Sequence, residues 1–168
     1  MGIFRIEEDV FWSLAPHDVS MMLALFKEEP REIKLDGQSF ITPGVKDEAR
    51  LNMTFPSGGR AHIFVSWLHP FKEQRLVVVG ERAMAVFEDT EADWNKKLAI
   101  YPHQVDMSSS EPVPIIAKPN YVSVPKIEPL KNECEEFLRA ICKQTIPYTN
   151  AKEALKVLQV MEEVSRFT

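Results

Sequence analysis

The sequence predicts an α+β fold with one large, open sheet, mainly antiparallel or mixed, and helices packed on one of its faces. Six segments with strand-like patterns follow one another with no helical pattern between them, which favours antiparallel hairpins. Helical patterns come only before and after this run. The second face of the sheet therefore needs a cover, from substrate, a partner subunit or a further domain.

The elements follow from local signals along the chain. Pro16 suits a first helical turn and an apolar run follows it, so a helix is predicted over residues 16–27. A turn or bulge is expected at Asp36-Gly37, a hairpin turn at residues 56–59, and a proline-rich surface connection over residues 107–125 with room for one edge strand. The predicted strands are residues 32–41, 48–55, 60–68, 74–79, 83–87 and 98–101. Two helices should end the fold, at about residues 129–144 and 151–164, the second capped by Thr149 or Asn150.

Composition places limits on the class of protein. A chain of 168 residues suits a single domain, here residues 1–168, and the net charge of −5 argues against a nucleic-acid or membrane partner. The sequence has no run long enough to span a membrane, no signal-peptide core at its start, and no His or Cys spacing typical of a metal site. Cys134 and Cys142 are too far apart on one helix for a disulfide, so reduced, partly buried thiols in a cytoplasmic protein are expected.

The first candidate site is His17-Asp18, expected in the opening turn of the first helix. A histidine at this polarised end could take a proton from a substrate hydroxyl at neutral pH. The alternative is structural, with Asp18 favouring the helix dipole and His17 solvated.

The second candidate is the strand end from Trp67 to Lys72. Alternation places His62, Phe64 and Ser66 on one face, with Ile63, Val65, Trp67 and His69 on the other. His69 and Lys72 could contact a polar ligand, and the alternative is a face buried against another subunit. Tyr101-Pro102-His103 is a weaker candidate, with an edge-strand end as its alternative, and Tyr148 is interpreted as packing.

The glycines show no dinucleotide or phosphate motif. The six glycines form neither Gly-x-Gly-x-x-Gly after a strand nor a Gly-x-x-x-x-Gly-Lys loop, so no nucleotide cofactor site is expected in this chain.

Four segments carry a family resemblance: Phe11-Trp12-Ser13-Leu14-Ala15-Pro16-His17-Asp18-Val19-Ser20, Ser66-Trp67-Leu68-His69-Pro70-Phe71-Lys72-Glu73-Gln74, Glu128-Pro129-Leu130 and Pro147-Tyr148-Thr149-Asn150. In this order they resemble the C-terminal half of a glucose-fructose oxidoreductase/inositol dehydrogenase-type (Gfo/Idh/MocA) protein, in the branch of bacterial nucleotide-sugar dehydrogenases. Ser13 departs from the pattern, which often has an Asp there.

The resemblance implies a role for this chain. It would be the substrate-binding and oligomerisation domain of an NAD(P)-dependent oxidoreductase acting on a sugar or nucleotide-sugar hydroxyl. NAD or NADP and a catalytic Lys would belong to an N-terminal Rossmann domain that is absent here, so the chain alone should be inactive. His17 would be the general base, with Trp12, Asp18, His69 and Lys72 as substrate contacts, and the open sheet face would make a homo-oligomer. The alternatives are a non-enzymatic sugar-sensing module and a plain dimerisation module.

Overall fold

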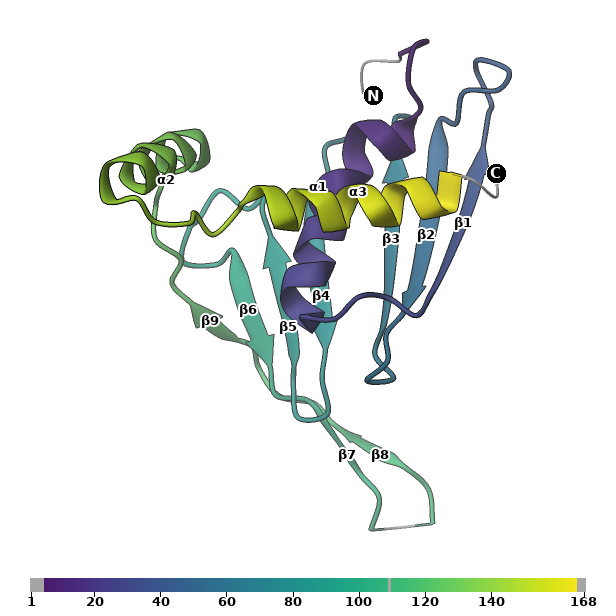
Figure 1. The fold of residues 1–168 in the computed structure, drawn as a ribbon. Helices are drawn as coiled ribbons and strands as arrows, with labels where there is room; N and C mark the ends of the chain where they lie inside the picture. The colour runs from purple at the N-terminus through teal and green to yellow at the C-terminus, as the bar shows by residue number, and fades with distance from the viewer. Residues whose placement is uncertain (1–4, 109, 166–168) are drawn as a thin grey trace. The chain divides into compact units, whose positions relative to one another are not determined.

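A computed structural model of the chain describes residues 5–108 and 110–165. The chain forms two compact units (Figure 1). Unit 1 comprises Met1–Pro70 and Arg139–Thr168, and unit 2 comprises Phe71–Leu138. The α+β class and the antiparallel pairing are confirmed, and the described strands are divided among three sheets. Among the residues described, no helix is long and apolar enough to cross a membrane.

Unit 1 contains a three-stranded antiparallel sheet in the order β1-β2-β3. Its strands are β1 (Glu32–Gln38), β2 (Glu48–Thr54) and β3 (Arg60–Ser66). The predicted turn between β2 and β3 is confirmed: the Gly58 N–H donates to the Phe55 carbonyl at 2.9 Å, and Gly58 has a φ of 87° that glycine adopts without strain. Strand alternation buries one face of this sheet, including Leu51, Met53, Ile63 and Val65.

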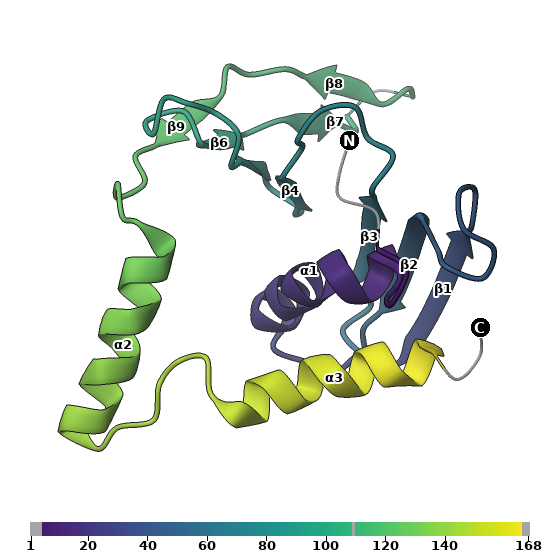
Figure 2. The same cartoon turned by 90° about the horizontal axis from the view of Figure 1, so that it is seen from above.

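Two helices cover that buried face. Helix α1 (Val10–Phe26) packs on β2 and β3, and α3 (Ala151–Ser165) packs on β1 and α1 (Figure 2). Asn150 caps α3 as predicted, since its Oδ1 accepts the Lys152 N–H at 2.9 Å. Met161 of α3 is fully buried. The predicted packing of helices on one face is therefore confirmed for this sheet.

The predicted start of the first helix was wrong. Helix α1 begins at Val10, and Asp9 is its N-cap because the Asp9 Oδ1 accepts the Trp12 N–H at 3.1 Å. Pro16 lies inside the helix and has no amide hydrogen to donate to the Trp12 carbonyl. Burial of apolar residues before and after the proline offsets this loss, with Val10, Phe11, Ala15 and Val19 all in the core.

At two glycines, a neighbouring side chain leaves no room for a Cβ atom. The expected turn or bulge at Asp36-Gly37 is wrong, since Gly37 pairs with Ala49 inside β1. A Cβ there would lie 2.5 Å from Cδ of Lys46, whose side chain crosses the strand at this point. At the other end of the sheet, a Cβ on Gly59 would lie 2.3 Å from Cε1 of Phe26, which also stacks on Phe55 at a centroid distance of 3.9 Å.

Unit 2 contains a four-stranded antiparallel sheet in the order β4-β5-β6-β9. Its strands are β4 (Arg75–Val79), β5 (Met84–Glu88), β6 (Leu98–Tyr101) and β9 (Asn120–Val122), and β7 (Gln104–Asp106) pairs separately with β8 (Val113–Ile115). The four-stranded sheet is apolar on both faces: Val77 opposes Val86 on one, and Leu76 opposes Phe87 on the other. No described helical segment of this unit packs on either face.

Helix α2 (Pro129–Lys143) begins in unit 2 and ends in unit 1. Its large apolar side chains are exposed, with Phe137 at 63% and Ile141 at 59%, and Ala140 is its one buried residue. Cys134 and Cys142 are free, as predicted, but both are exposed rather than partly buried because this face has no described partner.

Candidate functional site

Three of the predicted site residues lie on α1. His17 is exposed, and Trp12 and Asp18 are partly buried. Because the helix begins at Val10, His17 lies about 10.5 Å along the axis from its first residue, and not in the polarised opening turn. Any role of His17 must therefore come from its surroundings on the helix and not from the helix dipole.

His17 belongs to a stripe of α1 that faces away from the sheet of unit 1. Leu14 and Met21, one turn before and after it, are 39% and 38% exposed, and Leu25 extends the stripe at 49%. The opposite side of α1 is the buried one. A helix that is apolar on both sides is normally covered on both sides, so this stripe has the character of a second contact surface with an imidazole at its centre.

Asp18 is influenced by burial and by its neighbour. Desolvation raises the pKa of the Asp18 carboxyl above its usual value, and the positive charge available to His17 opposes this rise. The two side chains are thus electrostatically coupled.

His69 lies on the other side of the unit 1 sheet. Strand β3 ends at Ser66, where the Ser66 Oγ accepts the Leu68 N–H at 3.1 Å and the chain bends. The His69 ring contacts the Phe64 ring edge-on at 5.7 Å, and Phe64 belongs to the exposed face, with the Arg50 guanidinium 5.1 Å from its centroid. The prediction that His69 shares a face with Trp67 is therefore wrong, because alternation does not continue past the bend.

Lys72 belongs to unit 2, where it lines an open depression with Arg75, Glu88 and Glu91. Arg75 donates from Nε to the Glu88 Oε2 at 2.5 Å, so this depression contains an internal ion pair. Lys72 and the α1 residues belong to different units.

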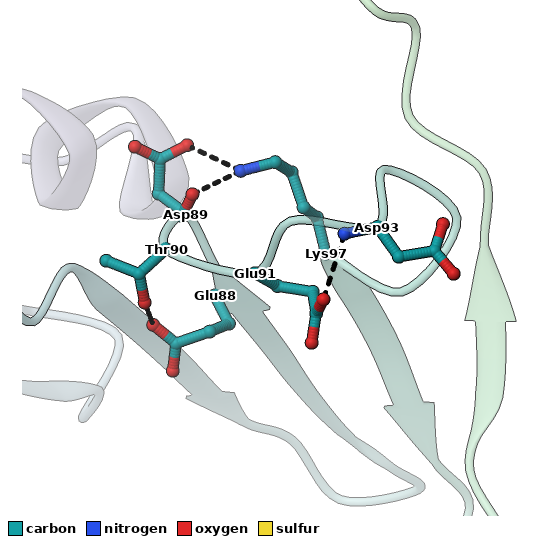
Figure 3. Close-up of polar contacts among 6 residues, drawn as sticks. All are labelled: Glu88, Asp89, Thr90, Glu91, Asp93 and Lys97. Atoms are coloured by element: carbon teal, nitrogen blue, oxygen red, sulfur yellow. Dashed lines mark hydrogen bonds and ion pairs between the residues drawn. The ribbon is translucent and has the colours of Figure 1, made fainter.

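A buried lysine orders the loop beside this depression. Lys97 is 6% exposed, and its ammonium donates to the Asp89 backbone carbonyl and lies 3.2 Å from the Asp89 Oδ1 (Figure 3). The Trp94 ring centroid is 5.0 Å from the same nitrogen. Further along the loop, the Glu91 carboxylate accepts the Asp93 N–H at 2.9 Å. These contacts fix the loop between β5 and β6.

The remaining candidates from the sequence are Tyr101, His103 and Tyr148. The His103 Nδ1 accepts the Ala117 N–H at 3.2 Å, and its ring lies 5.4 Å from that of Tyr101, which is consistent with the edge-strand alternative. Tyr148 is 79% exposed, so its interpretation as a packing residue is wrong among the residues described.

Sequence reasoning missed Asp47, which is 1% exposed. Its carboxylate Oδ2 accepts the backbone N–H groups of Phe40 and Ile41 at 2.7 and 2.8 Å. The one available signal was an acidic residue between a Pro-Gly turn and the predicted strand that begins at residue 48.

The described residues do not fit a dinucleotide. Such a cofactor binds where a glycine-rich turn joins a strand to a helix N-terminus. The segments leading into α2 and α3, and residues 5–9 before α1, contain no glycine. In the same described part of the chain, no group of three His, Cys, Asp or Glu residues could hold a metal ion.

Part of this chain is similar to a known protein family. Residues 5–86 match the family model described as the GFO/IDH/MocA C-terminal domain. Over these residues the chain resembles the C-terminal domain of the Gfo/Idh/MocA family. No curated protein matches the chain by sequence.

Solved structures share the fold of this chain. UDP-N-acetylglucosamine 3-dehydrogenase GnnA from Acidithiobacillus ferrooxidans is 23% identical, with a TM-score of 0.76 over 93% of this chain and 46% of that one. Aldose-aldose oxidoreductase from Caulobacter crescentus is 15% identical, with a TM-score of 0.71 over 95% and 45%. An NAD-binding protein from Listeria innocua is 18% identical, with a TM-score of 0.67 over 94% and 49%. The chain thus spans about half the length of these structures.

Proposed function

We propose that this chain is the substrate-binding and oligomerisation domain of an NAD(P)-dependent oxidoreductase that oxidises a hydroxyl of a sugar or nucleotide sugar. The observation that carries the proposal is His17 on the outward stripe of α1, with Leu14 and Met21 beside it. In support, a structure with this fold is named a UDP-N-acetylglucosamine 3-dehydrogenase. NAD or NADP would be held by a separate dinucleotide-binding domain, because the described residues of this chain do not fit it.

His17 would act on the proton of the substrate hydroxyl. An imidazole titrates near neutral pH, so its neutral form can accept this proton as the carbon is oxidised. The adjacent Asp18 carboxylate would stabilise the imidazolium that results. Trp12, five residues earlier on α1 and therefore about 140° around the helix from His17, would contact substrate from another side of the helix. Lys72 and His69 would contact substrate or a partner from their separate positions.

The test is turnover by the oxidoreductase that contains this domain. Replacing a general base typically lowers the rate by about 10²–10⁴-fold, so His17→Ala should lower kcat by that factor while the binding of NAD(P) is unchanged. Ser20→Ala, an exposed change on the same helix, is the matched control and should leave kcat unaltered. Full activity in His17→Ala would reject the assigned role.

The oligomerisation role is supported by the sheet of unit 2. Val77 and Val79 on β4, and Tyr121 on β9, are 47%, 77% and 53% exposed, and apolar surface of this kind marks interaction sites. Val77→Asp should lower the mass measured by light scattering if a second copy covers this face. If the wild type and the variant are both oligomers of the same mass, the interface lies elsewhere. If the wild type is a monomer, the oligomerisation role is rejected.

A further inference from the structure

Asp47 joins three segments at one end of the unit 1 sheet. Its carboxylate holds the connection after β1 through the N–H groups of Phe40 and Ile41. Its own N–H donates to the Gln38 carbonyl at 2.8 Å, and its carbonyl accepts the N–H of Trp67, just past β3, at 3.0 Å. A buried carboxylate is costly unless its oxygens accept hydrogen bonds, and here backbone donors satisfy it. The end of β1, the β1–β2 connection and the exit of β3 are thereby fixed together.

Lys46, the preceding residue, holds the start of α1. Its carbonyl accepts the Val10 N–H at 2.9 Å, one of the first-turn amides that have no partner within a helix. Its ammonium lies 3.4 Å from Oδ2 of Asp9, the N-cap, after its stem has crossed Gly37. We call these two residues the Lys46–Asp47 clamp. Through them the first turn of α1 is attached to the same point as the exit of β3.

We propose that the Lys46–Asp47 clamp positions α1, and with it His17, relative to the sheet, with Asp47 as the positioning residue. This inference rests on the proposed function. Val10, Phe11 and Ala15 are buried along the two turns from the helix start to His17, and Pro16 removes one hydrogen bond of this continuous helix, so a shift of the first turn moves the imidazole with it. A misplacement of about 1 Å can lower a rate by about 10²-fold, which makes such an attachment relevant to turnover.

The other end of α1 has a separate anchor, which provides an internal control. Phe26 stacks on Phe55 and lies against Gly59, and the Glu28 carboxylate accepts the Ser57 N–H at 3.0 Å. His17 lies between the two anchors. If the clamp positions the helix, loosening it should free the first turn of α1 and the β3 exit together while leaving this second anchor closed.

The structural arm uses amide hydrogen exchange, followed by NMR, in the full chain. Asp47→Ala should raise exchange of the Val10 and Trp67 amides by at least about tenfold, the factor that corresponds to losing one charged hydrogen bond. Asp47→Asn keeps an acceptor oxygen and should restore part of the protection, and it also serves if the Ala variant does not fold. Gly59→Ala should raise exchange at Phe55 instead. Unchanged protection of Val10 in both Asp47 variants, or a uniform rise throughout unit 1, would overturn the inference.

Turnover of the oxidoreductase that contains this domain separates this inference from the proposed function. The clamp predicts that Asp47→Ala lowers kcat at least tenfold, more than it changes the KM for NAD(P), and that Asn restores part of the loss. Loss of turnover in His17→Ala with full turnover in Asp47→Ala overturns the clamp alone. Full turnover in His17→Ala rejects the proposed function, and with it the catalytic purpose of the clamp.

Discussion

Replacement of Lys97 would measure the contribution of the buried ammonium to the stability of unit 2. Lys97→Met keeps an apolar stem of similar length but removes the charge. The lost interactions are a charge-assisted hydrogen bond to the Asp89 carbonyl, about 1.5–3 kcal/mol, and the contact with the Trp94 ring, about 0.5–2 kcal/mol. The Asp89 carboxylate adds little, because its side chain is 51% exposed and water can replace the ammonium. These losses sum to about 2–5 kcal/mol, and Met also avoids the desolvation cost of a buried ammonium, so we expect Lys97→Met to lower the free energy of unfolding by about 2 kcal/mol.

Truncation to alanine should cost more. Lys97→Ala removes about three buried methylene groups in addition, at roughly 0.8 kcal/mol each, for a total loss of about 4 kcal/mol. Urea unfolding followed by tryptophan fluorescence would measure both variants. Lys96→Met is the matched control, since this neighbouring side chain is 57% exposed, and it should change stability by less than about 0.5 kcal/mol. A Met variant as stable as the wild type would refute the reasoning, because the ammonium would then contribute nothing beyond its own desolvation.

Three further perturbations test other parts of the fold. Gly59→Ala should destabilise the protein by about 1–3 kcal/mol in thermal unfolding, because its Cβ would displace the Phe26 ring, whereas Gly80→Ala meets only ordinary contacts and should be neutral within about 1 kcal/mol. Asp9→Ala removes the N-cap of α1 and should cost about 1 kcal/mol by urea unfolding; no change would mean that Lys46 alone holds this end. Burial raises the folded-state pKa of Asp18, so its ionised form opposes folding above the unfolded pKa near 3.8. Asp18→Asn should therefore be more stable than the wild type at pH 7, with the difference lost as the pH falls below about 4; a difference independent of pH would contradict this.

Strand positions were predictable because burial on one face repeats every two residues. Leu51 and Met53 on β2 alternate with exposed neighbours, and this alternation is visible in the sequence. His69 was misplaced because the alternation rule assumes an extended backbone, and the chain bends after Ser66. A side-chain hydrogen bond to a backbone amide two residues later has no periodic signature.

The start of α1 was mispredicted because Pro16 is a strong local signal. Proline suits a first helical turn, but Asp9 seven residues earlier provides the N-cap, and the tertiary contacts of Val10 complete the first turn. His17 could be proposed from the sequence, whereas its position on an outward stripe could not. Asp47 and Lys97 were not predicted for a different reason. Each buried charge is held by the geometry of a loop, through partners six to eight residues away, and such a loop has no periodic pattern in the sequence.

The order of residues in unit 1 has a consequence for synthesis and folding. Unit 1 is assembled from two stretches, and all of unit 2 is made between them. During translation the sheet and α1 emerge long before α3, which supplies the fully buried Met161. Until α3 arrives, the sides of β1 and α1 that it covers remain open to solvent. Nascent chains stalled between unit 2 and α3 should therefore engage chaperones that bind apolar segments, and release them once residues 151–165 have left the ribosome.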